Sequence, residues 1–173
     1  VSSNTASIQI GQQLGSKKLY DYLTDFGFGK STGSHLPGES AGLLRPVDDW
    51  SGTSLPTFSY GHGYSVTSLQ ATSVFATIAN DGVRITPTVV AGTTDASGNY
   101  IPAKNQETKR VISAETAREI RKMLESVVSA NGTAPTAAIP GYRVAGKTGT
   151  AMRFNSNCSC YSGYTASFIG FAP

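Results

Sequence analysis

Two short groups of polar residues, far apart in the sequence, combine hydroxyl, amide and ammonium side chains. Residues Ser2–Asn4 have the sequence Ser-Ser-Asn and precede a predicted helix, and residues Lys147–Thr150 have the sequence Lys-Thr-Gly-Thr on a predicted strand. Hydroxyl and amide groups both donate and accept hydrogen bonds, and a lysine adds a positive charge. Such a set could relay a proton and hold a carboxylate. Each group alone has an ordinary explanation, because Ser-Ser-Asn is a common helix-capping cluster and Lys-Thr-Gly is a frequent tripeptide.

The second group also completes a pattern from another class of protein. Residues Gly141–Thr148 satisfy G-x-x-x-x-G-K-[ST], the nucleotide-binding P-loop pattern. A P-loop follows a buried strand and opens a helix at its Lys-Thr. Here residues 132–140 are poor strand material, and Gly149 disfavours a helix. Nucleotide binding is therefore the less favoured hypothesis, and tight binding of ATP by residues 1–173 would be needed to support it.

The segments between the two groups resemble one enzyme family along essentially the whole chain. Residues Leu36–Gly42 (LPGESAG), Phe58–Thr67 (FSYGHGYSVT) and Ala76–Gly82 (ATIANDG) are similar to segments of that family. A Ser-x-Asn motif followed far downstream by Lys-Thr-Gly matches two of the three motifs of the active-serine penicillin-recognising enzymes. The chain thus resembles class B penicillin-binding proteins, and their division-specific branch most closely.

The resemblance implies serine acyl transfer at the D-Ala-D-Ala end of peptidoglycan stem peptides during septal cell-wall synthesis, blocked by covalent binding of β-lactams. It implies catalytic roles for Ser2 (proton relay), Asn4 (substrate amide), Lys147 (charge near the substrate carboxylate) and Thr150 (oxyanion N–H), and substrate-binding roles for Thr148 and Gly149. The Thr148 hydroxyl would contact the carboxylate. Gly149 would let the substrate backbone approach the strand closely and bind it by strand addition.

In this family the nucleophilic serine and its lysine partner lie in a Ser-x-x-Lys motif upstream of Ser-x-Asn. No lysine within residues 1–173 has a serine three positions before it. We therefore expect residues 1–173 to be a partial penicillin-binding transpeptidase domain, truncated at both ends, inactive and unstable in isolation. A serine needs an adjacent base to become a nucleophile, so the chain alone would lack the covalent route. Alternatives are a non-catalytic β-lactam-sensing or scaffold relative, a D,D-carboxypeptidase and a β-lactamase.

Composition and charge limit the other classes of function. The chain has 173 residues and a net charge of +3, with basic residues scattered rather than clustered, so we expect no nucleic-acid partner. No apolar run approaches the ~20 residues of a membrane span. The resemblance implies a parent protein on the extracytoplasmic face of the bacterial cell membrane, held by an N-terminal helix outside this sequence. It also implies partners in the division machinery, and a mechanism that needs no cofactor or metal.

Cys158 and Cys160 are the two cysteines of the chain. A zinc site normally takes four ligands, and the C-x-C spacing differs from the C-x-x-C redox motif. The pair is predicted to lie in a loop, either as free thiols or as a tight local disulfide.

The expected elements follow from periodicity and capping signals. The chain is predicted to begin with a helical stretch over 5–26, broken near Gly15 with Ser16 as a cap, and to continue with an irregular stretch over 27–66. A helix over 67–80 follows, with Thr67 and Gln70 as its capping box, and then β-prone segments 83–94 and 100–111 joined by a turn at 95–99. The last elements are a helix over 113–131, capped by Ser113 and ended by Gly132, and strands over 141–153 and 161–171. These elements predict an α+β or layered α/β fold. The resemblance implies an incomplete penicillin-binding-protein/β-lactamase-like transpeptidase fold, with a helical lobe and part of an antiparallel sheet.

Overall fold

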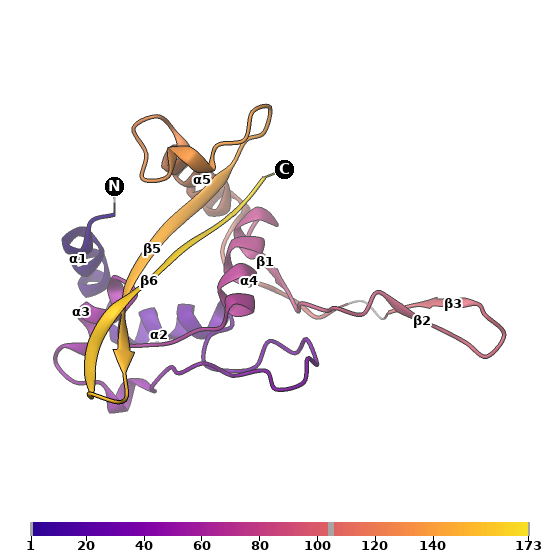
Figure 1. The fold of residues 1–173 in the computed structure, drawn as a ribbon, viewed down its shortest axis with the longest axis horizontal. Helices are drawn as coiled ribbons and strands as arrows, with labels where there is room; N and C mark the ends of the chain where they lie inside the picture. The colour runs from indigo at the N-terminus through magenta and orange to yellow at the C-terminus, as the bar shows by residue number, and fades with distance from the viewer. Residues whose placement is uncertain (1, 104–105, 173) are drawn as a thin grey trace.

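A computed structural model describes residues 2–103 and 106–172, so Val1, Pro173 and two residues of the second predicted β segment, Lys104 and Asn105, lie outside the described residues. A helical lobe lies on one side of a long antiparallel strand pair, and a narrow arm projects from the lobe (Figure 1). The described strands form three separate two-stranded antiparallel sheets. This mixture of helices and antiparallel strands confirms the predicted fold class.

The N-terminal helical stretch consists of two helices, as predicted. Helix α1 spans Asn4–Leu14 and helix α2 spans Ser16–Asp25. Gly15 separates them with φ 81° and ψ 158°, a conformation that glycine adopts without steric cost. The prediction that Ser16 caps α2 is wrong. Gly15 occupies the cap position without a side-chain hydrogen bond, and Ser16 is already helical.

The stretch over 27–66 contains two short elements that its composition does not indicate. These are a 3-10 helix, η1 (Val47–Asp49), and a helix, α3 (Ser54–Ser59). Phe58 on α3 is buried and packs against Trp50, with ring centroids 4.5 Å apart. Helix α3 also lies close against α1, because a Cβ added at Gly11 would fall on the Ser59 side chain. The irregular interpretation was therefore wrong at α3, which tertiary contacts stabilise.

The central helix α4 spans Ser68–Ala79 and begins as predicted. Gln70 N–H donates to Thr67 Oγ1 at 3.1 Å, and Thr67 N–H donates to Gln70 Oε1 at 2.8 Å, so both bonds of the capping box are present. The helix ends before Asp81 and Gly82, which have positive φ angles of 49° and 81°.

Helix α5 spans Ala114–Glu125 and is shorter than predicted. Ser113 Oγ accepts a hydrogen bond from Thr116 N–H at 3.0 Å, which confirms the predicted cap. After Glu125 the chain tightens into a 3-10 helix, η2 (Ser126–Val128), and a second one, η3 (Pro135–Ala137), follows. The helix therefore does not run to residue 131. The helix ends at Glu125, so the predicted end at Gly132 is wrong, and Ala134 N–H donates to Val127 C=O at 2.9 Å where the chain turns back after η2.

The two β-prone segments form a projecting arm instead of one continuous hairpin. Strand β1 (Val83–Ile85) pairs with β4 (Thr108–Arg110), and β2 (Gly92–Thr94) pairs with β3 (Tyr100–Pro102). Between β1 and β2 lies Pro87, which has no N–H to donate and so interrupts a ladder. The predicted turn is confirmed, because Asp95 accepts hydrogen bonds from the backbone of Ser97 and Asn99.

The long strand pair consists of β5 (Ala145–Asn155) and β6 (Cys160–Phe171). Strand β5 begins four residues later than predicted, because Tyr142 N–H closes a turn onto Ile139 C=O. A disulfide joins Cys158 in the loop to Cys160 at the start of β6, so the pair forms the local disulfide, one of the two predicted alternatives. Buried apolar residues join the strand pair to the lobe, among them Ile78, Ala117, Val144 and Ala145. Within the described residues, the longest apolar helix is too short to cross a membrane.

Candidate functional site

Lys147 and Ser2 meet where β5 passes the beginning of α1. The Lys147 ammonium donates a hydrogen bond to Ser2 Oγ at 3.0 Å, although 145 residues separate them. The same ammonium donates to its neighbour's carbonyl, Thr148 C=O, at 2.8 Å. The structure therefore brings together Ser2 and Lys147, one residue from each of the two polar groups. A cation fixed beside a hydroxyl is suited to holding an anion and to polarising that hydroxyl.

The three residues Ser2–Asn4 have different structural roles. Ser3 is the N-cap of α1, and its Oγ accepts a hydrogen bond from Ala6 N–H at 3.3 Å. This bond commits the Ser3 side chain to the helix end. Ser2 and Asn4, on either side of the cap, are exposed, and Asn4 is the first helical residue. The cap thus sets the direction in which α1 starts and keeps Ser2 next to Lys147.

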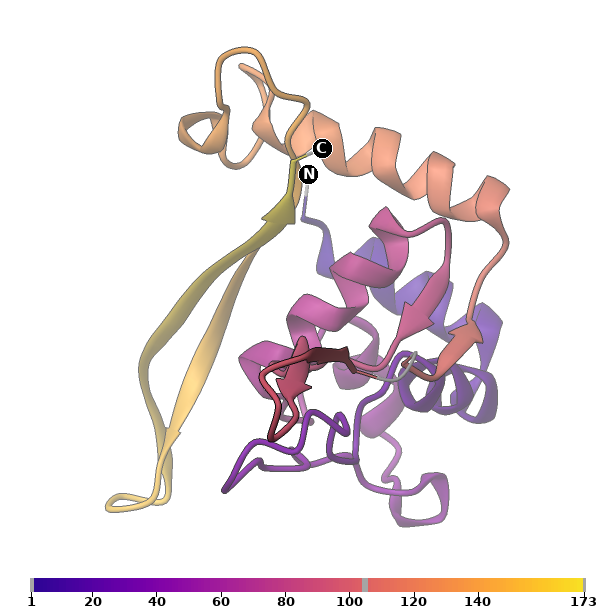
Figure 2. The ribbon, with the colours of Figure 1, turned by 90° about the vertical axis from the view of Figure 1, so that its right-hand side faces the viewer.

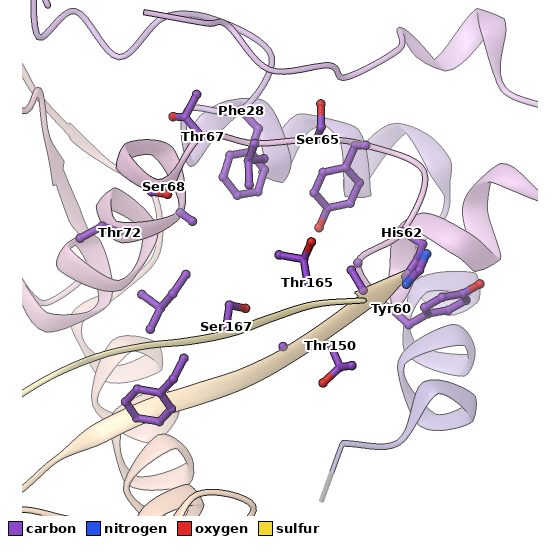
Figure 3. A pocket seen from close by; sticks show the side chains of 18 of the residues that line it. Phe28, Tyr60, His62, Ser65, Thr67, Ser68, Thr72, Thr150, Thr165 and Ser167 are labelled. Carbon is purple, nitrogen blue, oxygen red and sulfur yellow. The ribbon is translucent and has the colours of Figure 1, made fainter. Parts of the chain in front are cut away.

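Strand β5 divides its four site residues between two faces. Side chains alternate along a strand, so Thr148 and Thr150 lie on one face and Lys147 and Gly149 on the other. Thr148 Oγ1 lies 3.1 Å from Thr133 Oγ1. Figure 3 shows the Thr150 side chain pointing away from Thr165 and Ser167, which point to the opposite side of the strand pair.

Gly149 is required by the close approach of β6. It pairs with Ser167, and a Cβ added at Gly149 would lie 2.6 Å from Ser167 Oγ. Among the described residues β5 pairs only with β6, so its other edge carries backbone groups free to bind an extended peptide.

A cavity of about 890 Å³ lies between the strand pair and the helical lobe, on the Ser167 side of β5 (Figure 3). Its lining mixes apolar and aromatic side chains with many hydroxyl groups, and includes Phe28, Tyr64, Val66, Ala71, Thr165 and Ser167. Burial raises the pKa of the Tyr64 phenol, so this group stays protonated and able to donate. The sequence analysis did not single out Phe28 or Tyr64, which no local pattern distinguishes from core residues.

His62 lies at one end of this cavity, beside Tyr60, and the two ring centroids are 5.3 Å apart. The glycines on both sides of His62 have positive φ, 91° at Gly61 and 85° at Gly63. The backbone bend at this Gly-His-Gly segment therefore turns the chain into the wall of the cavity (Figure 3).

Gln70 holds the lobe side of the cavity in place, beyond its role in the capping box. Its side chain is 1% exposed, and its Nε2 donates to Lys30 C=O at 2.8 Å and to Ala41 C=O at 3.0 Å. Both amide hydrogens of Gln70 are therefore donated, and its Oε1 accepts one hydrogen bond, from Thr67 N–H, so only one acceptor position of the amide is unused. Gln70 ties two distant points of the irregular stretch to the start of α4, next to the cavity-lining residue Thr67.

The P-loop hypothesis fails on the local structure. Lys147 and Thr148 lie inside β5, and no helix begins at either of them. The residues before them form a turn at Gly141, and Val144, which leads into β5, is buried, so this segment is not a phosphate-binding loop. In the described part of the chain, no group of three or more His, Cys, Asp or Glu side chains could hold a metal ion.

Comparisons with known proteins agree along the whole chain. The family model of the penicillin-binding protein transpeptidase domain matches residues 1–173. The chain is 43% identical over 179 residues to penicillin-binding protein PbpB of Mycobacterium tuberculosis, covering 99% of this chain and 26% of PbpB. It is 39% identical over 174 residues to stage V sporulation protein D of Bacillus subtilis, covering 99% of this chain and 27% of that protein. The chain therefore spans about a quarter of the length of these relatives.

The structural comparison gives the same result. The crystal structure of penicillin-binding protein 3 from Mycobacterium tuberculosis complexed with aztreonam matches with a TM-score of 0.95 and 43% identity. The match covers 99% of this chain and 40% of that one. The predicted resemblance and the transpeptidase fold are thereby confirmed.

Proposed function

Because the chain belongs to the family of penicillin-binding protein transpeptidase domains, we propose that the whole protein is a serine-type peptidoglycan D,D-transpeptidase of the division-specific branch. The observation that carries this proposal is the hydrogen bond from the Lys147 ammonium to Ser2 Oγ, beside a strand edge that can bind a peptide. Residues 1–173 are proposed to be part of the transpeptidase domain, and to be inactive alone.

The proposed reaction is acyl transfer at a D-Ala-D-Ala bond. A serine hydroxyl attacks the carbonyl of the first D-Ala, its proton passes to a base, and the terminal D-Ala leaves as an amine that takes up a proton. An amine from a neighbouring stem peptide then attacks the acyl-enzyme and releases the serine. The nucleophile and its base are proposed to lie in a Ser-x-x-Lys motif outside residues 1–173, because these residues contain none.

Residues of this chain supply the rest of the site. Ser2, polarised by Lys147, relays the proton toward the departing nitrogen. Asn4 holds the substrate amide. The Lys147 charge and the Thr148 hydroxyl bind the terminal carboxylate, and the Thr150 backbone N–H contributes half of the oxyanion hole.

The substrate is proposed to lie along the free edge of β5. Gly149 is proposed to permit this close approach, because a glycine has no side chain to hold the substrate backbone away from the strand. The cavity on the Ser167 side of β5 is proposed to receive the segment that carries the nucleophile, because Phe28 and Ala71 could pack against its apolar side chains.

The proposed location is the extracytoplasmic face of the bacterial cell membrane, with an anchor outside residues 1–173 and partners in the division machinery. The name of one similar protein, peptidoglycan D,D-transpeptidase FtsI of Buchnera aphidicola, which is 33% identical, supports the proposed location, because peptidoglycan lies outside the cell membrane. The second candidate is a non-catalytic β-lactam-binding or scaffold relative, which the lack of Ser-x-x-Lys in residues 1–173 keeps open.

Covalent labelling by a fluorescent penicillin tests the proposal. The full-length gene product is expected to give a band that survives denaturing electrophoresis, and the 173-residue chain none. Excess unlabelled penicillin should abolish the band, whereas penicillin hydrolysed beforehand should not. A full-length product that binds penicillin reversibly, or not at all, would support the non-catalytic candidate instead.

A further inference from the structure

The distal half of the strand pair carries exposed aromatic side chains that continue the face of Thr148 and Thr150. Strand register places Thr148 opposite Phe168, Thr150 opposite Ala166 and Met152 opposite Tyr164, so these pairs share one face. Beyond an irregularity between Met152 and Phe154, Phe154 lies opposite Tyr161 on the same face. We call the four side chains Met152, Phe154, Tyr161 and Tyr164 the distal face.

The distal face is unusually exposed for its composition. Exposed fractions are 46% for Met152, 58% for Phe154, 60% for Tyr161 and 68% for Tyr164. Figure 2 shows that the tip of the β5–β6 pair extends away from the helical lobe. Large apolar side chains that gather on one exposed face mark binding sites more often than single exposed ones do.

Two features hold the distal face rigid. The Phe154 and Tyr161 rings are in edge contact, with centroids 5.8 Å apart and planes at 75°. The next pair toward the tip is Asn155 and Cys160, and Cys160 forms the disulfide with Cys158 that closes the turn. The aromatic pair is thus fixed before any ligand arrives, which lowers the entropic cost of binding.

The rest of the site determines where a substrate would extend. The beginning of β5 is covered by the segment after α5, because Thr133 Oγ1 contacts Thr148 Oγ1 and η2 packs on β5. A peptide whose terminal carboxylate lies at Lys147 and Thr148 therefore cannot continue in that direction. Its chain must run along β5 toward Asn155.

The length of the substrate brings its far end to the distal face. A stem peptide of about five residues spans about 17 Å when extended, and β5 rises about 20 Å between Thr148 and Phe154 at ~3.3 Å per residue. The N-terminal residue of the stem is joined through a lactyl group to an N-acetylated amino sugar. That sugar would lie beside Phe154, Tyr161 and Tyr164. Aromatic rings cover the C–H face of a sugar, and phenol hydroxyls can bind its hydroxyls and amide.

We propose that the distal face is a subsite for the amino sugar that carries the stem peptide, so that this site prefers stem peptides attached to glycan over free peptides. The proposal rests on the transpeptidase function proposed above and specifies its substrate. It assigns Tyr161, Tyr164 and Phe154 to substrate preference, with Thr148 and Lys147 anchoring the opposite end of the same ligand.

The test uses the full-length gene product and two donor substrates, a free pentapeptide and the same pentapeptide bearing its lactyl-linked amino sugar. The ratio of their kcat/KM values is measured for the unchanged protein, for the double variant Tyr161→Ala/Tyr164→Ala and for Phe154→Ala. We expect the double variant to reduce the preference for the sugar-bearing substrate about five- to tenfold, as for the loss of one or two aromatic contacts. Tyr142→Ala is the matched control, because Tyr142 is 60% exposed but precedes β5.

The outcomes separate the two proposals. A protein that takes no penicillin label overturns the transpeptidase proposal and this subsite with it. A labelled protein whose distal-face variants keep the full preference for the sugar-bearing substrate overturns only the subsite. Distal-face variants whose kcat/KM falls equally on both substrates also overturn the subsite, since an equal fall would indicate a role in folding or in binding the peptide itself. Loss of self-association in size-exclusion chromatography with an unchanged preference would assign the distal face to a second copy of the protein.

Discussion

Lys147 and Ser2 are joined by a hydrogen bond of 3.0 Å across 145 residues of sequence. This single contact fixes β5 against the beginning of α1, and it sets the geometry on which the proposed chemistry depends. The Ser3 cap on α1 and the turn before β5 hold the two partners from opposite sides. The contact therefore relates the beginning of the helical lobe to the position of β5, the proposed substrate-binding strand.

The first prediction concerns this contact. Ser2→Ala removes the proposed proton relay and should slow covalent labelling by penicillin about 100-fold, at the lower end for general acid–base groups. Lys147→Ala should slow it about 100- to 1,000-fold, because a charged donor near the developing anion is lost. The measurement is the second-order labelling rate of the full-length gene product. Lys18→Ala, on the exposed face of α2, is the control. Rates within twofold of the unchanged protein would remove both residues from the mechanism.

The second prediction concerns the contact between Gly149 and Ser167. Gly149→Ala would place a methyl group 2.6 Å from Ser167 Oγ and should destabilise the protein by about 1 kcal/mol, a small overpacking cost because the hydroxyl can rotate. In a Ser167→Ala background most of this cost should disappear, since the Ser167 Cβ would be 4.0 Å away. Chemical unfolding of the four members of this double-mutant cycle measures the coupling. Additive effects would show that the two positions do not constrain each other.

The third prediction concerns Gln70. Gln70→Leu leaves two backbone carbonyls and the Thr67 N–H without their partner in a buried site, so the free energy of unfolding should fall by about 2–4 kcal/mol. Gln13→Leu, on an exposed part of α1, is the control and should change stability little. Thermal unfolding compares the two. A Gln70→Leu protein that melts like the unchanged one would contradict the role given to this side chain.

Local signals in the sequence predict the elements that are stabilised locally. The capping box of Thr67 and Gln70 and the cap at Ser113 follow from residue spacing, and both are present. Helix α3 was not predicted, because the stretch over 27–66 that contains it is rich in Gly, Ser and Pro and because Phe58 packing on Trp50 stabilises it. The arm was predicted as one hairpin, but Pro87 divides it.

The arrangement of the site could not be predicted from residue spacing in the way that the helix caps could. Spacing alone cannot reveal that Ser2 and Lys147 meet, because no local rule relates residues so far apart. Only the family resemblance connected them. The links from Gln70 to Lys30 and Ala41 span 40 and 29 residues, and nothing in the sequence marks them. The cavity beside β5 is likewise a product of packing between distant elements.

The fourth prediction concerns stability in acid. The Arg121 guanidinium donates to Asp81 Oδ1 at 2.7 Å and, with Arg118 and Arg110 nearby, holds the pKa of Asp81 below its ordinary value of 3.8. The unfolded chain therefore binds this proton more readily than the folded one. The stabilising contribution is present above pH 3.8 and is lost as the pH falls through the lower folded-state pKa.

Asp81→Asn tests this acid dependence without changing the backbone, because Asn also tolerates the positive φ of residue 81. The variant should be less stable than the unchanged protein at neutral pH, and the difference should shrink below pH 3.8 and vanish once the pH falls below the lower folded-state pKa of Asp81. Urea unfolding at a series of pH values gives the comparison, with Asp48→Asn in η1 as the control. A stability difference that persists unchanged into strong acid would contradict the assignment.

The most direct test of the central claim is to map the penicillin adduct. The full-length gene product is labelled with penicillin and digested, and the acylated serine is identified by mass spectrometry. We predict one adduct, on a serine that is followed three positions later by lysine and lies outside residues 1–173, and its formation should depend on Lys147 and Ser2. An adduct on Ser2 or another residue of this chain, or no adduct at all, would contradict it.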